Sequence, residues 1–147
     1  MTVKLRLLGL ALLYAIVTGA TAKTPDVRII IVVNAANSVS TMKREHLAKI
    51  FLRQIETWND GQEILPVDQI DRSPARAAFA RRIEGQSVSA LRRYWQERIF
   101  TGNESPPPER VTDADVLTYV RSNAGAIGYV TEGVELGTGV KEITITE

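Results

Sequence analysis

The chain has 147 residues, 18 of them Lys or Arg and 17 Asp or Glu, and its formal net charge is +1. Such a near-neutral balance does not indicate a protein that binds nucleic acid or a membrane surface. The chain contains no cysteine, which excludes disulfides, thiolate metal sites, a thiol nucleophile and a lipid-modified cysteine.

The N-terminus is typical of a secretory signal peptide. Lys4 and Arg6 precede an apolar run over residues 7–17, and a small-residue sequence then ends at Ala22. A membrane anchor is the alternative, but the run is shorter than the roughly 20 residues that a membrane-spanning helix needs. We therefore expect cleavage after Ala22 and export to the periplasm without a lipid anchor.

The remaining residues, 23–147, are expected to form one domain. The continuous β-branched run over 27–33 predicts a central strand that is covered on both faces. Ser40 or Thr41 is then expected to cap a helix that ends near the turn at 58–61. The apolar positions of this helix are Leu47, Ile50 and Phe51.

Two helices are predicted after a short strand at 64–67. Ser73 and Pro74 have the pattern of an N-cap and a first helical residue, and Gly85 is expected to end the helix that they begin. A longer helix follows over 87–102, with Leu91, Tyr94, Trp95 and Ile99 on one face.

Helices and strands also follow one another in the C-terminal part of the sequence. The proline-rich segment 103–109 predicts an extended connector rather than a ligand for an aromatic groove. Thr112 and Asp115 form a capping pair for a further helix. Residues 126–130 and 140–145 are the last predicted strands, and strands that alternate with helices indicate the α/β class.

Three segments together resemble the phosphate-type periplasmic solute-binding proteins of ABC importers. They are Ile50-Phe51 followed by Thr57-Trp58-Asn59-Asp60-Gly61, the strand-to-helix turn that leads to Phe79, and Gly125-Ala126-Ile127-Gly128-Tyr129-Val130. The resemblance spans residues 27–130. It implies a single lobe of the type 2 periplasmic-binding-protein fold, with a mixed, mostly parallel sheet flanked by helices. The implied function is solute binding, of phosphate or a similar oxyanion, without enzymatic activity.

We interpret the shared strings mainly as markers of the fold. Trp58 supplies a large apolar anchor, while Gly125 and Gly128 permit turns and a close backbone approach around a buried strand.

The candidate anion site is the turn at residues 69–76. Proteins of the family that this chain resembles typically have an arginine at a strand end and then Ser-Gly-Thr at a helix start, where amides and a guanidinium stabilise the anion. Here Ser73 matches the serine, whereas Gln69 replaces the arginine, and Pro74 and Ala75 replace glycine and threonine. The predicted ligand-binding residues are Gln69, Arg72, Ser73 and Arg76, of which the two arginines would supply charge, Ser73 a hydroxyl and an amide, and Gln69 a side-chain amide.

The sequence has no counterpart of a second lobe, so three kinds of assembly stay open. The chain could act with an ABC-transporter membrane component, form a homodimer that recreates a cleft, or be an envelope protein-interaction module that kept the lobe and lost solute binding.

Catalytic and metal chemistry have little support. His46 is the only histidine, and no Gly-x-Ser-x-Gly elbow accompanies it, so we expect a surface residue and no enzyme. The sequence has no metal-binding spacing, and we expect no metal or cofactor. The arginines at 81–82, 92–93 and 98 are interpreted as a solvated surface rather than a nucleic-acid site.

Overall fold

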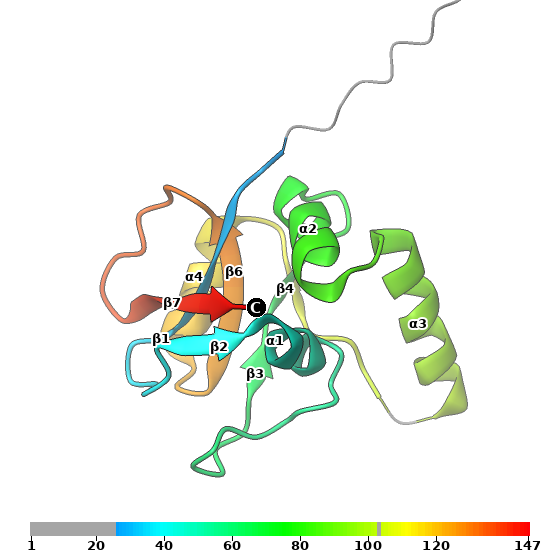
Figure 1. Cartoon of the computed structure of the whole chain (residues 1–147), viewed down its shortest axis with the longest axis horizontal. Helices are drawn as coiled ribbons and strands as arrows, with labels where there is room; N and C mark the ends of the chain where they lie inside the picture. Colours follow the sequence, from blue (N-terminus) through cyan, green and yellow to red (C-terminus); the bar gives the residue numbers. More distant parts are fainter. Residues whose placement is uncertain (1–25, 103) are drawn as a thin grey trace, which may run out of the picture.

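The structure is a computed structural model that describes residues 26–102 and 104–147 (Figure 1). The predicted signal peptide lies outside the described residues. The helices and strands of the structure are, in chain order, β1 Ile29–Asn34, β2 Thr41–Lys43, α1 Arg44–Phe51, β3 Leu65–Pro66, β4 Asp68–Gln69, α2 Pro74–Phe79, the π-helix η1 Ala80–Glu84, α3 Val88–Thr101, β5 Glu109–Arg110, α4 Asp113–Ser122, β6 Ala126–Thr131 and β7 Val140–Thr146. Within these residues, no helix has the length and apolar character needed to cross a membrane.

A mixed sheet forms the centre of the lobe, as predicted, but the expectation that it is mostly parallel is wrong, because its two long pairings are antiparallel. The strand order is β2-β7-β1-β6-β3, so β1 occupies the expected central place. The long pairings of β1 with β6 and β7 are antiparallel, whereas the short pairings β2 with β7 and β3 with β6 are parallel. A separate parallel pair joins β4 to β5, and this small ribbon carries the candidate site to the edge of the sheet.

Both faces of β1 are buried, as its continuous β-branched run predicts. Ile31 and Val33 belong to one apolar cluster, and Val32 belongs to another. The first cluster includes residues of α1 and α2, and the second includes Val116 and Val120 of α4. The sheet is therefore packed between helices, which matches the α/β prediction.

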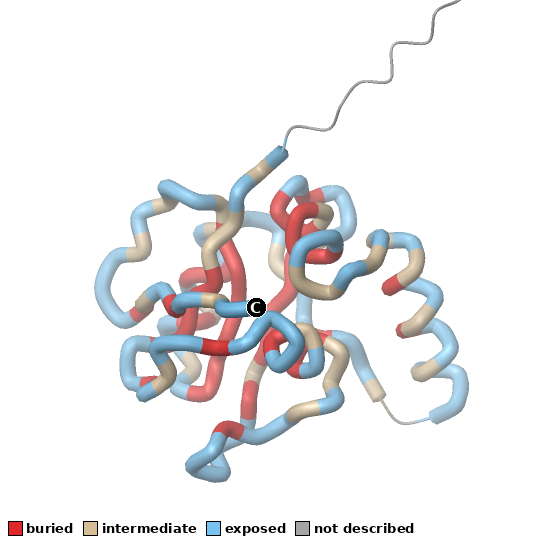
Figure 2. The backbone as a smooth tube through the Cα atoms, viewed as in Figure 1, coloured by how far each residue is buried: buried red, intermediate tan, exposed pale blue. Residues whose placement is uncertain are grey.

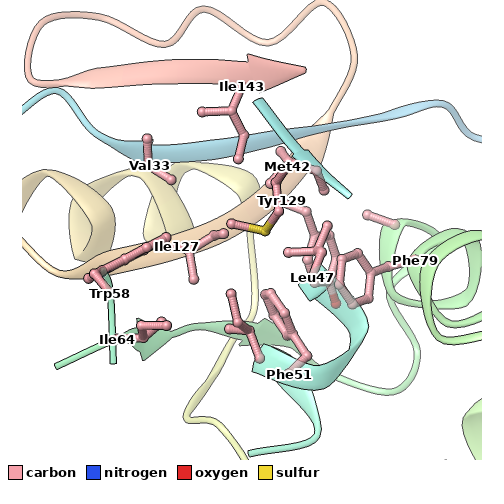
Figure 3. Close-up of a cluster of buried hydrophobic side chains, with 13 residues drawn as sticks. Val33, Met42, Leu47, Phe51, Trp58, Ile64, Phe79, Ile127, Tyr129 and Ile143 are labelled. Atoms are coloured by element: carbon pink, nitrogen blue, oxygen red, sulfur yellow. The ribbon is translucent and has the colours of Figure 1, made fainter. Parts of the chain in front are cut away.

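The larger cluster has an aromatic centre beside the candidate site (Figure 3). The rings of Phe79 and Tyr129 stack with centroids 4.1 Å apart, and Phe51 lies 4.5 Å from Phe79. Tyr129 is fully buried, so its hydroxyl group needs a polar partner inside the protein.

The three fold markers have the structural roles that the sequence predicts. Trp58 is buried, and its Nε1 donates a hydrogen bond to the Gly125 carbonyl at 3.0 Å. A Cβ atom on Gly125 would lie 2.1 Å from the Glu63 carbonyl oxygen, so only glycine fits this approach. A Cβ atom on Gly128 would lie 2.8 Å from Val67 Cγ1.

The predicted helix boundaries agree with the structure where the sequence signal is a capping residue close to the helix end. The Ser73 side chain accepts from the Arg76 amide with Pro74 next in the chain, and the Thr112 side chain accepts from the Asp115 amide. Gly85 ends its helix at a φ of 66°. These signals need no distant partner, which is why the sequence alone reveals them.

The first helix differs from its prediction at both ends. Ser40 and Thr41 do not cap it, because Thr41–Lys43 pairs as β2 with β7, and the N-cap is Lys43, without a side-chain hydrogen bond. The helix ends at Phe51 rather than near 58–61. Arg53 follows with a φ of 57°, a left-handed conformation that stops the helix.

Helix α3 packs lightly at the side of the lobe (Figures 1 and 2). Only Leu91 and Trp95 of its residues are buried, and Ile99, predicted on the same face, is 56% exposed. Tyr94 Oη donates to the Leu52 carbonyl at 3.0 Å. The side of α3 that carries Leu91 and Trp95 forms one wall of a cavity next to the candidate site.

Candidate functional site

The structure brings three of the four predicted site residues together in one buried turn. Ser73 Oγ donates to Gln69 Oε1 at 2.7 Å and accepts from the Arg76 amide at 3.4 Å. Gln69, Ser73 and Arg76 are all buried. Arg72 is exposed and takes no part in these contacts.

The side-chain amide of Gln69 is engaged by the protein itself. Its Nε2 donates to the Tyr129 carbonyl at 3.1 Å and to Asp113 Oδ1 at 2.8 Å. These bonds tie the turn to β6 and to the start of α4. Gln69 thus holds the turn in place against the sheet.

Arg76 lies between two carboxylates. Its Nε is 3.3 Å from Asp68 Oδ1, and its Nη1 is 2.7 Å from Glu84 Oε2. The side chains of Arg76, Asp68 and Glu84 are only 5%, 9% and 1% exposed. The site is therefore a buried cluster with one positive and two ionisable acidic groups.

The π-helix η1 explains how Glu84 reaches Arg76. Residues eight positions apart on a regular α-helix are offset by about 80° around its axis, since each residue turns it by about 100°. The wider turn at Ala80–Glu84 reduces the angular advance per residue and brings Glu84 back over Arg76.

Burial dominates the acid–base behaviour of this cluster. It raises the pKa of Asp68 and of Glu84, although the nearby Arg76 charge opposes the shift of each. Burial disfavours the charged form of Arg76, but Asp68 and Glu84 more than offset this and raise its pKa. The guanidinium consequently stays protonated, and the carboxyl groups are the ones that titrate.

Asp68 is fixed by its neighbours through one oxygen. The Tyr129 hydroxyl donates to Asp68 Oδ1, and the backbone amide of Gln69 donates to the same oxygen at 2.8 Å. Arg76 Nε approaches that oxygen as well. Burial and the Asp68 charge raise the pKa of Tyr129, so this hydroxyl remains a donor.

A cavity of about 180 Å³ adjoins the cluster between α3, β4 and the proline connector. Its polar lining residues are Asp68, Asp71, Arg76, Arg92 and Glu109, and its apolar ones include Val88, Leu91, Trp95, Ile99, Pro106 and Pro107. Of the four predicted site residues, only Arg76 lines it.

Two lining groups keep an unengaged atom. Among the described residues, Arg76 Nη2 and Asp68 Oδ2 have no hydrogen-bond partner, whereas Arg76 Nε and Nη1 and Asp68 Oδ1 are engaged. In the part of the chain that the structure describes, no buried side-chain nitrogen or oxygen lacks a partner, so these two atoms are accessible to solvent. They therefore remain as one donor and one acceptor for a ligand that enters the cavity.

Asp68, Glu84 and Tyr129 belong to this site but were not predicted as site residues from the sequence. Asp68 directly precedes Gln69 at a strand end, a position that could have signalled a site residue. The spacing of Arg76 and Glu84 carries no signal, because residues eight apart are separated by about 12 Å along the axis of a regular helix.

Other candidate chemistry stays apart from this site. His46 is exposed, as expected, and lines a separate cavity of about 230 Å³ with Lys43 and Trp58. Within residues 26–102 and 104–147, no group of three His, Asp or Glu residues comes together in a way that could hold a metal ion. Four of the five surface arginines, Arg81, Arg82, Arg92 and Arg98, form ion pairs with Asp or Glu residues, and of these only Arg92 lines the cavity beside the site.

Comparisons with known proteins agree with this architecture. The sequence profile described as the PBP superfamily domain matches residues 27–143. A Vibrio cholerae ABC-type phosphate transport receptor superposes with a TM-score of 0.62 at 24% identity, over 80% of this chain and 45% of that one. Among curated proteins, no sequence matches.

Two further solved structures share the fold. One is a putative phosphate ABC transporter substrate-binding protein from Clostridium perfringens with bound phosphate, at a TM-score of 0.58 and 19% identity, over 80% of this chain and 44% of that one. The other is PstS from Borrelia burgdorferi, at a TM-score of 0.63 and 13% identity, over 81% of this chain and 47% of that one. This chain spans less than half the length of each, which corresponds to a single lobe.

Proposed function

Because this chain belongs to the PBP domain superfamily, we propose that it is a periplasmic, non-enzymatic solute-binding protein that takes phosphate or a similar oxyanion for an ABC importer. The fold shared with phosphate receptors supports the ligand class. The signal-peptide pattern that ends at Ala22 supports export.

The observation that carries the proposal is the unengaged donor and acceptor of Arg76 and Asp68 beside the cavity. Hydrogen phosphate presents oxygens that accept from a guanidinium and a hydroxyl group that donates to a carboxylate. Sulfate at neutral pH has no proton to donate, so Asp68 repels it. We therefore expect the site to prefer phosphate over sulfate.

The four residues of the predicted turn take different parts in this proposal. Arg76 contacts the anion. Gln69 and Ser73 hold the turn, since their side chains bond to each other and the Gln69 side chain also bonds to β6. Arg72 adds positive charge from the exposed rim.

Thermal unfolding of the mature protein tests the proposal. Phosphate at about 100 times its dissociation constant should stabilise the fold by about 2.7 kcal/mol, a shift of several degrees. Sulfate, carboxylates and uncharged solutes serve as the comparison panel. Absence of a shift with every oxyanion would refute solute binding and leave a protein-interaction module as the remaining function.

The variant Asp68→Asn tests the role of the carboxylate. It keeps the size of the side chain and removes the charge that excludes sulfate, so the preference for phosphate should shrink. A variant with undiminished preference would show that Asp68 does not select the anion. Asp60→Asn is the matched control, because it makes the same change at an exposed position outside the cavity and should leave the preference unchanged.

The described lobe leaves one side of the ligand facing water, so the proposal includes a second wall. We propose a second copy of the chain, the importer's membrane component or another envelope protein in this role. Sedimentation with and without phosphate distinguishes the first case, since a homodimer would double the mass when phosphate is added.

A further inference from the structure

The cavity beside Arg76 is larger than an inorganic oxyanion requires. Its volume of about 180 Å³ corresponds to about six water molecules at roughly 30 Å³ each. A phosphate ion at Arg76 and Asp68 would leave the wall formed by Leu91, Trp95 and Pro107 without contact. Such an apolar wall favours the carbon atoms of an organic ligand.

The charges of the cavity are also unbalanced. Arg76 lies beside Asp68, and Arg92 is paired with Asp71. Glu109 has no ion-pair partner among the described residues, although it lines the same cavity. One carboxylate therefore remains at the rim, on the strand β5 that pairs with β4 and its Asp68.

The titration of Glu109 agrees with this arrangement. Partial burial raises the pKa of Glu109, and the Asp68 and Asp71 charges raise it further. A cationic group placed between these carboxylates would relieve their mutual repulsion.

We infer that the ligand of this cavity is a small organic zwitterion, with an oxyanion group at Arg76 and Asp68 and an ammonium group at Glu109, joined by a short carbon chain along Trp95. The inference rests on the proposed solute-binding function and specifies the ligand class of the same site. An ammonium group near Trp95 would also gain from the aromatic ring if it lies over the ring face.

Calorimetric titration of the mature protein with three probes tests this inference. The probes are 2-aminoethylphosphonate, ethylphosphonate, which lacks only the amino group, and inorganic phosphate. We expect 2-aminoethylphosphonate to bind at least about tenfold more tightly than ethylphosphonate, a difference of about 1.4 kcal/mol. Equal or weaker binding of the amino compound would overturn the inference.

The variant Glu109→Gln tests whether Glu109 binds the ammonium group. The position is exposed, so the variant should fold, and the advantage of the amino compound should fall to less than about threefold. Glu97→Gln makes the same charge change on α3 outside the cavity and should leave the advantage intact. An advantage that survives Glu109→Gln would overturn the assignment.

The outcomes separate the two proposals. If phosphate and ethylphosphonate bind but the amino group adds nothing, solute binding stands and the zwitterion inference fails. If no probe binds, the proposed function itself fails.

Discussion

Arg76 is the residue on which the buried cluster depends, because among the described residues it is the one cation that pairs with Asp68 and Glu84. We expect Arg76→Met to lower the free energy of unfolding at pH 7 by about 3–5 kcal/mol, since it leaves two buried carboxylates without a counter-charge. Urea denaturation of the mature protein measures the loss. The double variant Arg76→Met with Glu84→Gln should recover part of it, since one uncompensated charge is then removed.

Arg82→Met provides the matched control for this prediction. Arg82 sits on the same helical stretch, but it is 38% exposed and pairs with the exposed Asp26. Loss of a surface pair costs up to about 1 kcal/mol. A similar loss of stability in Arg76→Met and Arg82→Met would show that burial does not determine how much the Arg76 ion pairs contribute to the free energy of unfolding.

Gly128 is the second residue whose identity the packing dictates. A methyl group there would meet Val67 Cγ1 at 2.8 Å and Val116 Cγ1 at 2.9 Å, both in the core between β6 and α4. We expect Gly128→Ala to cost about 1–3 kcal/mol of overpacking, measured by urea denaturation. Adding Val67→Ala should recover part of this cost by making room, and a purely additive double variant would contradict the explanation.

The residue scale also shows what a sequence can reveal about a site. Ser73 was identifiable because a cap and the proline after it are local signals. Asp68 and Glu84 were not, because their partnership with Arg76 arises from a strand end and a π turn. Chemistry assembled by irregular backbone leaves no periodic trace in the sequence.

The helices and strands were predictable to different degrees for a related reason. The strand around β1 and the helix α4 follow from apolar patterns and a capping pair. The short strand β2 exists because it pairs with β7, about a hundred residues later, and such pairing overrides the helix-cap pattern of Ser40 and Thr41.

Helix α3 is the element with the weakest attachment, which gives a prediction about local stability. Trp95 and Leu91 are its only buried residues among those described, and the helix is otherwise exposed. We expect Trp95→Ala to detach α3 while the sheet stays folded, because the lost side chain attaches α3 to the lobe and is not part of the packing between the sheet and the other helices. Hydrogen exchange should show faster exchange of the α3 amides, with little change in β1 and β6.

Ile99→Ala is the control for α3, because Ile99 lies on the same helix and is 56% exposed. It should leave exchange across α3 nearly unchanged. Equal loss of protection in the sheet and in α3 after Trp95→Ala would mean that the whole lobe unfolds as one unit.

At the scale of the whole molecule, the buried carboxyl groups predict how stability depends on pH. The raised pKa values of Asp68 and Glu84 mean that the folded protein binds protons more readily than the unfolded chain, whose carboxyl groups titrate near about 4. Their contribution to stability is therefore complete below about pH 4 and is lost as the pH rises through their folded pKa values.

Glu84→Gln tests this dependence across the lobe. We expect the melting temperature of the wild type to fall through these groups as the pH rises above about 4, and that of the variant to fall less, because the variant has one fewer buried acid to ionise. Glu97→Gln, at an exposed position on α3, should keep the wild-type slope. Identical slopes for all three proteins would contradict the prediction.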